Sequence, residues 1–199
     1  MENSKTAFIA IVGKANVGKS SILNRLIGSK IAIVSSKPQT TRTRIMGVLT
    51  TDDNIQLVFT DTPGFHKPKN KLGEIMVQTV SDSISGVDSC LFVVEANDRG
   101  INQAEKELIE KFKSEKMTVV LAINKIDTVK NKEDLMLRIS ELSQLYDFKA
   151  VVPVSASDGN GMSDLLGELK ALAVDSVHFF PDDTLTDQPE RVLAAEIIR

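Results

Sequence analysis

One loop near the N-terminus limits what this chain can fold into more than any other feature. Residues 13–20 read Gly-Lys-Ala-Asn-Val-Gly-Lys-Ser, which fits the pattern of a glycine, four residues of any type and Gly-Lys-Ser/Thr. The loop follows an apolar run at residues 7–12 and precedes a helical pattern at residues 21–27. In this strand–loop–helix context, backbone N–H groups and the helix N-terminus favour an anion. The sequence therefore predicts a phosphate-binding loop.

Two side chains of this loop are predicted to contact a bound nucleotide directly. The Lys19 ammonium would reach the β- and γ-phosphates, and the Ser20 hydroxyl would be a ligand of Mg²⁺. The alternative is a glycine-rich turn between strand and helix that binds nothing. The loop alone indicates a nucleotide without identifying its base. The predicted phosphate-binding residues are Gly13, Lys14, Ala15, Asn16, Val17, Gly18, Lys19, Ser20 and Ser21.

Apolar periodicity indicates that strands and helices alternate along the chain. The second and third expected strands are separated only by residues 52–54 and their neighbours, a hairpin length that makes this pair antiparallel. The alternation predicts a three-layer α/β P-loop domain with a six-stranded, mostly parallel sheet, one antiparallel pair and helices on both faces. The expected strands are 6–12, 45–51, 56–60, 89–95, 118–123 and 150–154, and the expected helices are 19–27, 72–85, 103–113, 134–145 and 162–173.

Composition and charge argue against several classes of protein. The chain has 24 basic and 27 acidic residues, and this slightly acidic balance is not that of a typical nucleic-acid binder. No apolar run approaches the length of about 18 residues that a membrane span needs, and residues 1–6 are too polar for a signal peptide. The single cysteine, Cys90, lies in an apolar run and is expected to be a buried core thiol. These features favour a cytoplasmic protein.

The base of the nucleotide is indicated by Asn-Lys-Ile-Asp at residues 124–127, directly after the fifth expected strand. The Asp127 carboxylate can accept from both N1–H and the N2 amino group of guanine, whereas adenine offers neither donor in that place. Asn124 would tie this segment to the phosphate-binding loop, and the Lys125 stem would lie along the base. A polar turn without a ligand is the alternative. Ser-Ala-Ser follows the sixth strand and could offer a backbone N–H to guanine O6; the candidate residues are Asn124, Lys125, Asp127, Ser155, Ala156 and Ser157, with Ala156 supplying that N–H.

A second set of candidates belongs to the γ-phosphate end of the site. Asp61 could hold Mg²⁺ through water, and the Gly64 N–H could approach the γ-phosphate where a side chain would obstruct it. The basic loop at residues 30–44 carries two threonines, one of which could bind Mg²⁺ only while a γ-phosphate is present, so that GTP orders the loop and GDP releases it. An ordinary polar loop is the alternative. The candidates here are Thr40, Thr41, Asp61, Thr62, Pro63 and Gly64, and the expected Mg²⁺ ligands are Ser20, Thr41 and Asp61.

Residues 8–174 resemble a small GTPase domain of the translation-factor-related class. Residues 37–42, residues 61–69 and the tail at residues 180–199 narrow this resemblance to the Era-like family of bacterial ribosome-assembly GTPases. The resemblance implies GTP hydrolysis to GDP and phosphate, coupled to binding of 16S ribosomal RNA and to maturation of the 30S subunit. It also implies a cytoplasmic protein with some association with the inner membrane, and we expect a monomer.

The expected catalytic residues are Lys19, Asn16 and Gly64. A Ras-like enzyme places a water-orienting glutamine directly after the Asp-x-x-Gly glycine, and this chain has Phe65 there, so slow intrinsic turnover is expected. In GTPases that resemble this one, an asparagine at the position of Asn16 can hold K⁺ beside the phosphates, in the place of an arginine finger. The alternative is that Asn16 only stabilises the loop.

The resemblance also divides the chain into two parts. Residues 1–174 form the expected GTPase domain, and residues 175–199 form a linker and the first helix of a truncated KH-type RNA-binding domain, whose Gly-x-x-Gly loop is absent from this sequence. The chain is therefore expected to bind GTP while having lost most of its RNA affinity. Two other functions are compatible with the phosphate-binding loop: a GTP-responsive scaffold whose hydrolysis is incidental, and a P-loop kinase. The kinase is disfavoured because residues 124–127 would then have no purpose.

Overall fold

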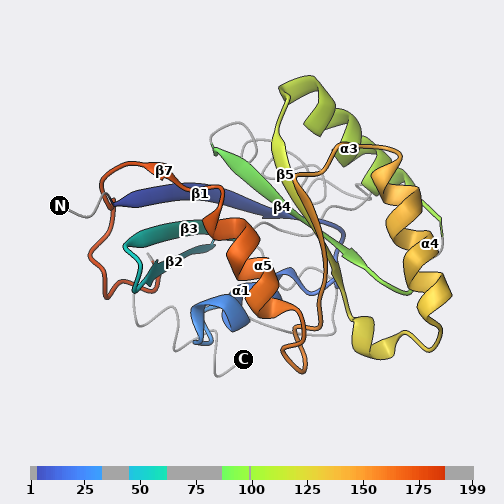
Figure 1. Ribbon diagram of the computed structural model, residues 1–199, viewed down its shortest axis with the longest axis horizontal. Coiled ribbons are helices and arrows are strands. Elements are labelled where there is room, and N and C mark those ends of the chain that lie inside the picture. The colour runs from blue at the N-terminus through green and yellow to red at the C-terminus, as the bar shows by residue number, and fades with distance from the viewer. Residues whose placement is uncertain (1–3, 33–44, 62–86, 99, 187–199) are drawn as a thin grey trace, which may run out of the picture.

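The computed structural model describes residues 4–32, 45–61, 87–98 and 100–186 (Figure 1). Its strands form one sheet in the order β2-β3-β1-β4-β5-β6, in which β2 and β3 pair antiparallel and the remaining neighbours in that order pair parallel. The strands are β1 (Lys5–Val12), β2 (Ile45–Thr51), β3 (Ile55–Asp61), β4 (Ser89–Glu95), β5 (Thr118–Asn124), β6 (Ala150–Pro153) and β7 (Val174–Asp175); the helices are α1 (Lys19–Ile27), α3 (Gln103–Glu115), α4 (Lys132–Ser143) and α5 (Met162–Lys170), with a short 3-10 helix at Ile126–Thr128.

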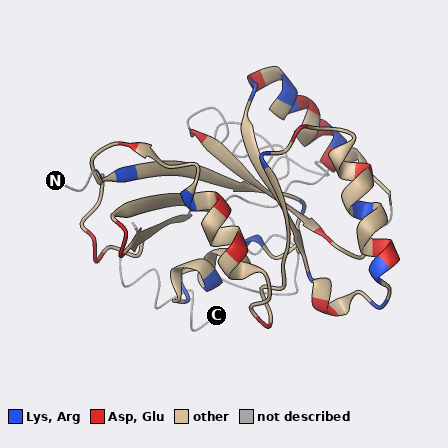
Figure 2. Cartoon of the chain, in the orientation of Figure 1, with Lys and Arg blue, Asp and Glu red and all other residues tan. Residues whose placement is uncertain are grey.

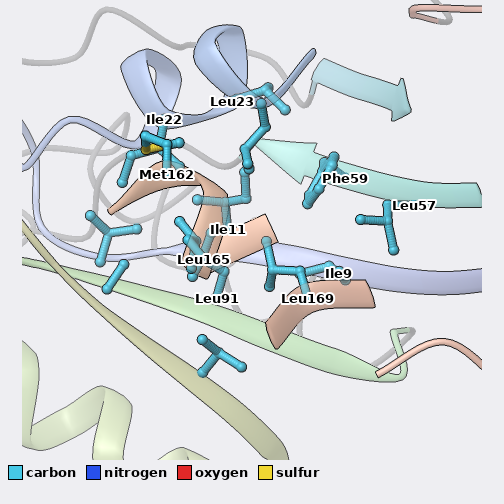
Figure 3. Close-up of a cluster of buried hydrophobic side chains, with 14 of the residues drawn as sticks. Ile9, Ile11, Ile22, Leu23, Leu57, Phe59, Leu91, Met162, Leu165 and Leu169 are labelled. Atoms are coloured by element: carbon cyan, nitrogen blue, oxygen red, sulfur yellow. The ribbon is translucent and has the colours of Figure 1, made fainter. Parts of the chain in front are cut away.

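The expected architecture is confirmed, including the antiparallel hairpin of β2 and β3. The two faces of the sheet are covered by different helices because alternate strand residues point to opposite sides. On one face, side chains such as Ile9 and Ile11 pack with α1 and α5, as Figure 3 shows. On the other face, Val12 and Phe92 pack with α3 and α4. The sheet is therefore the middle layer of three.

Helix α1 has the predicted bounds because a glycine directly after it ends the helix. Gly28 adopts a left-handed conformation (φ 75°) after the last turn, and its N–H donates to the Asn24 carbonyl at 3.0 Å. Helix α3 runs to Glu115, two residues beyond the prediction, and helix α5 ends at Lys170, three residues before it. The expected helix at residues 72–85 lies outside the described residues.

The residues that follow the GTPase domain boundary expected at 174 lie against the sheet. Strand β7 pairs antiparallel with the first residues of β1, which adds a seventh, two-residue strand to the six expected. The buried Gln56 amide accepts the backbone N–H groups of Phe179 and Phe180 at 2.8 and 3.0 Å. Further along, the Thr186 hydroxyl donates to the Met46 carbonyl at 2.7 Å. Residues 174–186 are thus fixed across β1, β3 and β2, and the expected helix of the second domain lies beyond the described residues.

Two other expectations concern the core and the membrane. Cys90 is fully buried in β4, and burial raises the pKa of its thiol to about 12, which agrees with a core cysteine. Within the part of the chain that the structure describes, no helix combines the length and the apolar composition needed to span a bilayer.

Candidate nucleotide-binding site

The predicted site residues are brought together by the direction of the strands. The parallel strands β1, β3, β4, β5 and β6 all point the same way, so the loops that follow them leave the sheet at one edge (Figure 1). The pairing register aligns Ile11 with Asp61, and Glu95 with Asn124. Ligands of such sheets bind beyond the carboxyl ends of the strands. The phosphate-binding loop and residues 124–127 therefore lie at the same edge of the sheet, the one formed by the carboxyl ends of the parallel strands.

The phosphate-binding loop turns tightly through two residues with left-handed backbone conformations, one asparagine and one glycine. Asn16 has φ 66° and Gly18 has φ 98°, both left-handed. The Lys19 side chain is 7% exposed, and its ammonium donates to the carbonyls of Gly13 and Lys14, each at 3.1 Å. Helix α1 begins with Gly18 as its N-cap and has no side-chain cap, so its first N–H groups are directed at the loop. A nearly buried cation and a helix N-terminus thus face the same space, which is an arrangement that binds phosphate.

Asn124 connects three loops at the centre of this edge. Its side chain is 2% exposed, and Nδ2 donates to the Val17 carbonyl of the phosphate-binding loop at 2.8 Å. Its Oδ1 accepts the Ala156 N–H, from the loop after β6, at 3.1 Å. The hydrogen bond from Asn124 to the phosphate-binding loop was predicted from the sequence, and the one that it accepts from the loop after β6 was not. Because the Ala156 N–H already donates to Asn124, a contact from it to guanine O6 requires the two acceptors to share it.

Replacing Gly18 with alanine is expected to weaken nucleotide binding by more than about tenfold. A Cβ at this position would lie 2.2 Å from the Asn124 Nδ2 atom, on a backbone at φ 98° that L-residues rarely adopt. The Asn124 amide would have to move, and the loops that it joins would separate. Titration of the variant with a fluorescent GDP analogue measures the effect.

Gly28→Ala is the matched control for this substitution. Gly28 is also left-handed, at φ 75°, but a Cβ there would meet nothing within 4 Å. This variant should lose only the conformational cost of about 1–2 kcal/mol in stability, with nucleotide affinity close to that of the parent. Equal losses of affinity in the two variants would contradict the importance of the space that Gly18 leaves for the Asn124 amide.

The base-reading candidates surround the short 3-10 helix after β5. The Asp127 carboxylate is exposed at the surface, and its Oδ1 accepts the Ser155 hydroxyl at 2.6 Å. Ser155 is fully buried, so its hydroxyl is a fixed group that orients the carboxylate. Lys125 has a left-handed backbone (φ 67°), and its ammonium lies 2.8 Å from a Glu95 carboxylate oxygen. Ser157, the remaining candidate of this loop, is exposed.

An open groove of about 580 Å³ lies beside these loops, a volume typical of small-molecule sites. Its lining includes Ser21 and Ala156, two candidates that are far apart in the sequence. It also includes Asn24 and Arg25 of α1, which the sequence reasoning did not single out. The groove lining is completed by Gly28, Ser29 and Lys30.

Asn24 and Arg25 hold the chain around the groove. The Asn24 Oδ1 accepts the N–H groups of Ile31 and Ala32, both at 2.9 Å, and so fixes the start of the basic loop. Arg25 donates to the Asp158 carbonyl at 3.0 Å. The pKa of the Asp158 carboxyl is lowered, mainly because it accepts the Asn160 backbone N–H and also through its hydrogen bond with Ser155. A polar residue one turn before a helix stop was the only sequence signal for Asn24.

The γ-phosphate end of the site is described only in part. Asp61 is the last residue of β3, and its backbone pairs with Ile11 of β1 and Ile45 of β2. The other candidates of this end, and Phe65, lie outside the described residues: Thr40, Thr41, Thr62, Pro63 and Gly64. A hydroxyl from Ser20 and a carboxylate from Asp61 are oxygen donors of the kind that Mg²⁺ prefers.

Comparison with known proteins gives one family and several close relatives. A family model described as "50S ribosome-binding GTPase" matches residues 8–125. GTPase Era of Clostridioides difficile (strain 630) is 44% identical over 199 residues, a match that covers 98% of this chain and 65% of the relative. GTPase Era of Ruminiclostridium cellulolyticum is 47% identical over 195 residues, covering 98% of this chain and 64% of the relative. This chain therefore spans slightly less than two thirds of the length of these relatives.

A solved structure agrees with these sequences. The crystal structure of Era in complex with MgGDPNP and nucleotides 1506–1542 of 16S ribosomal RNA superimposes with a TM-score of 0.90 at 36% identity. The match covers 98% of this chain and 66% of the other. The similarity thus extends through residues 174–186, beyond the range of the family model.

Proposed function

The chain belongs to the family of 50S ribosome-binding GTPases, and from that premise we propose that it binds GTP, hydrolyses it to GDP and phosphate, and acts as a switch in maturation of the small ribosomal subunit. The observation that carries the proposal is the Asn124 side chain, whose 2.8 Å bond to Val17 joins residues 124–127 to the phosphate-binding loop. A polar turn without a ligand would have no need of that junction. The base-reading and phosphate-binding groups are set at one fixed separation, as a single nucleotide requires.

Phosphoryl transfer depends on position and charge more than on covalent chemistry. In the proposed reaction, the Lys19 ammonium and the N–H groups at the start of α1 bind the β- and γ-phosphates. Ser20 and Asp61 would hold Mg²⁺, with Thr41 as a further ligand in the GTP state, and the ion would supply neutralising charge between the phosphates. The Gly64 N–H would contact the γ-phosphate. Phe65 cannot orient the attacking water by hydrogen bonding, so turnover is slow without a further group.

Guanine is selected by Asp127 in this proposal. One oxygen of its carboxylate is held by the Ser155 hydroxyl at 2.6 Å, which leaves the exposed side of the group for N1–H and the N2 amino group of the base. A donor–acceptor pair of this kind discriminates strongly because the group left without its partner loses a hydrogen bond. The Lys125 stem lies along the ring, and Ala156 and Ser157 close the site on the side of β6.

The ribosomal partner is proposed to be 16S RNA within the 30S subunit. The family description names the 50S subunit, whereas the similar Era structure contains 16S RNA, and the proposal follows the likeness that covers 98% of this chain. In Figure 2, basic and acidic residues are interspersed along α3 and α4, so neither helix carries charge of a single sign that would favour RNA phosphates. A monomeric state, a cytoplasmic location and peripheral contact with the inner membrane belong to the same proposal and rest on the resemblance to Era alone.

Phosphate release from GTP under multiple-turnover conditions tests the proposal. We expect slow phosphate release by the chain alone and faster release when 30S subunits are added. If most of the RNA affinity lies outside residues 1–199, the subunits should accelerate this chain less than they accelerate a chain that contains the RNA-binding part. GTP binding without any turnover, in the presence or absence of subunits, would instead support a GTP-responsive scaffold. Equal use of ATP and GTP, with transfer to a small-molecule acceptor, would support a kinase.

Potassium is proposed as a second cation of the site. Asn16 lies in the phosphate-binding loop with a left-handed backbone at φ 66°, a conformation that asparagine tolerates. A K⁺ ion held by its side-chain oxygen would add positive charge beside the phosphates, and we expect hydrolysis at least about tenfold faster in KCl than in NaCl.

Asn16→Gly removes the side chain without straining this backbone, so it is the variant for the test. It should lose the potassium effect while keeping its affinity for GDP. Equal turnover of the parent in the two salts would leave Asn16 with a structural role only.

A further inference from the structure

Four consecutive residues, the last of β4 and the three that follow it, contact both halves of the nucleotide site, although no motif marks them. We name residues 95–98 the β4 exit segment. The Glu95 carboxylate lies 2.8 Å from the Lys125 ammonium, and the Ala96 N–H donates to the Asn124 carbonyl at 2.9 Å. In two further contacts, Asn97 Nδ2 lies 2.5 Å from Thr128 Oγ1, and Asp98 Oδ2 lies 3.5 Å from Lys14 Nζ.

Glu95 is placed differently from the other residues of its strand. The six preceding residues of β4 are fully buried, and Glu95 alone is partly open at the edge where the strand ends. Glu95 pairs in register with Asn124. The residue after Asn124 is Lys125, and this pairing brings it close to the Glu95 side chain. The two side chains are 29% and 33% exposed, which leaves their ion pair partly shielded from water. A charged pair in such a place is stronger than one on an open surface.

The lysine side chain is long and flexible, so an ion pair at its end restricts where the stem can lie. The backbone at φ 67° sets where the side chain begins, but four rotatable bonds separate it from the ammonium. If the stem lies along the purine ring, as proposed above, it must stay in one extended rotamer. An anchor at its far end fixes that rotamer before the nucleotide arrives.

We propose that Glu95 is a positioning residue for nucleotide binding: its carboxylate holds the Lys125 ammonium so that the lysine stem covers the face of the purine base. This inference rests on the proposed binding of a guanine nucleotide. It assigns Glu95 to residence time and not to base choice, because the lysine stem contacts the ring face and Asp127 reads the ring edge. Loss of the carboxylate should therefore speed nucleotide release without changing the order of preference among purines.

A double-mutant cycle on the dissociation rate of a fluorescent GDP analogue tests the proposal. Glu95→Gln keeps the length of the side chain, Lys125→Met keeps most of the apolar stem, and each removes the same ion pair. Each should raise the dissociation rate about three- to tenfold. The double variant should be no more than about twofold faster than the faster single variant. Effects that multiply in the double variant would overturn the proposal, as would a Glu95→Gln protein with the parent rate.

Asp98→Asn is the matched control. It neutralises another acid of the β4 exit segment, but one that pairs with Lys14 and not with Lys125. Its effect, whatever the size, should multiply with that of Lys125→Met, because the two changes break different contacts. A Glu95→Gln chain that does not fold, by circular dichroism and thermal unfolding, would assign the carboxylate to the fold and would also overturn the proposal.

Inosine nucleotides separate this inference from the proposed function. IDP lacks the N2 amino group that Asp127 would bind, so it should bind more weakly than GDP, and Glu95→Gln should weaken both by the same factor. A change in the GDP-to-IDP ratio would contradict the assignment of Glu95 to the ring face. If the parent chain binds GDP no better than ADP, the proposed function itself fails, whatever the Glu95 variants do.

Discussion

Replacing Asp127 with asparagine is expected to lower the affinity for GDP by about 10³-fold or more and to create measurable binding of xanthosine diphosphate. The amide presents a donor where guanine also presents donors, so the guanine pair is lost. Xanthine carries an oxygen in place of the N2 amino group and can accept from the new amide. Competition titrations of the variant with GDP, XDP and ADP against a fluorescent nucleotide measure all three affinities.

Ser155→Ala serves as the control for that substitution. It removes the hydroxyl that holds Asp127 Oδ1 at 2.6 Å but leaves the carboxylate in place. We expect a loss of GDP affinity of about tenfold, without binding of XDP. An Asp127→Asn protein that still prefers GDP would show that another group reads the base.

Replacing Arg138 with methionine is expected to destabilise the fold by about 3–5 kcal/mol, because it leaves a buried carboxylate without its counter-charge. The side chains of Arg138 in α4 and Glu105 in α3 are each 2% exposed, and the distance from Arg138 Nη2 to Glu105 Oε1 is 2.5 Å. Arg138 also donates to the Gly100 carbonyl, and Glu105 also accepts the Asn102 N–H at the start of α3. The arginine therefore joins α4 to the loop between β4 and α3. Urea unfolding at neutral pH, followed by circular dichroism, measures the loss.

An exposed ion pair provides the comparison. Lys113 and Glu110 lie on the surface of α3 with side chains 47% and 70% exposed, and Lys113→Met should cost less than about 1 kcal/mol. The double variant Glu105→Gln with Arg138→Met should be less destabilised than the sum of its single variants, because it no longer buries an unpaired charge. A loss below about 1 kcal/mol for Arg138→Met would contradict the account of this pair.

The sequence was sufficient to predict those parts of the fold that depend on local pattern. Helix α1 matches its prediction residue for residue, since its glycines mark both ends. Strand β4 also matches, because the unbroken apolar run at residues 90–94 is typical of a strand that is buried on both faces. The convergence of residues 13–20 and 124–127 followed from the direction of parallel strands, and the Asn124–Val17 bond agrees with it.

The contacts that sequence did not predict join residues far apart in the chain. Gln56 binds Phe180 across 124 positions, and no local pattern distinguishes that glutamine from an exposed one. Likewise, the Nε2 atom of His178 lies 3.2 Å from the carbonyl oxygen of Asn54, a residue 124 positions away. Glu95 and Lys125 form an ion pair across 30 positions, and no motif in the sequence relates the two. The partners of such side chains can be identified only after the sheet has placed distant parts of the chain next to each other.

Competition between GDP and ADP for the unmodified chain, measured at equilibrium with Mg²⁺ present, tests the central claim most directly. In the proposed site, two donors on guanine would meet the Asp127 carboxylate and adenine would offer none there, so GDP should bind at least about 10³-fold more tightly. Equal affinity for the two nucleotides, or no binding of either, would contradict the assignment of this site to a guanine nucleotide.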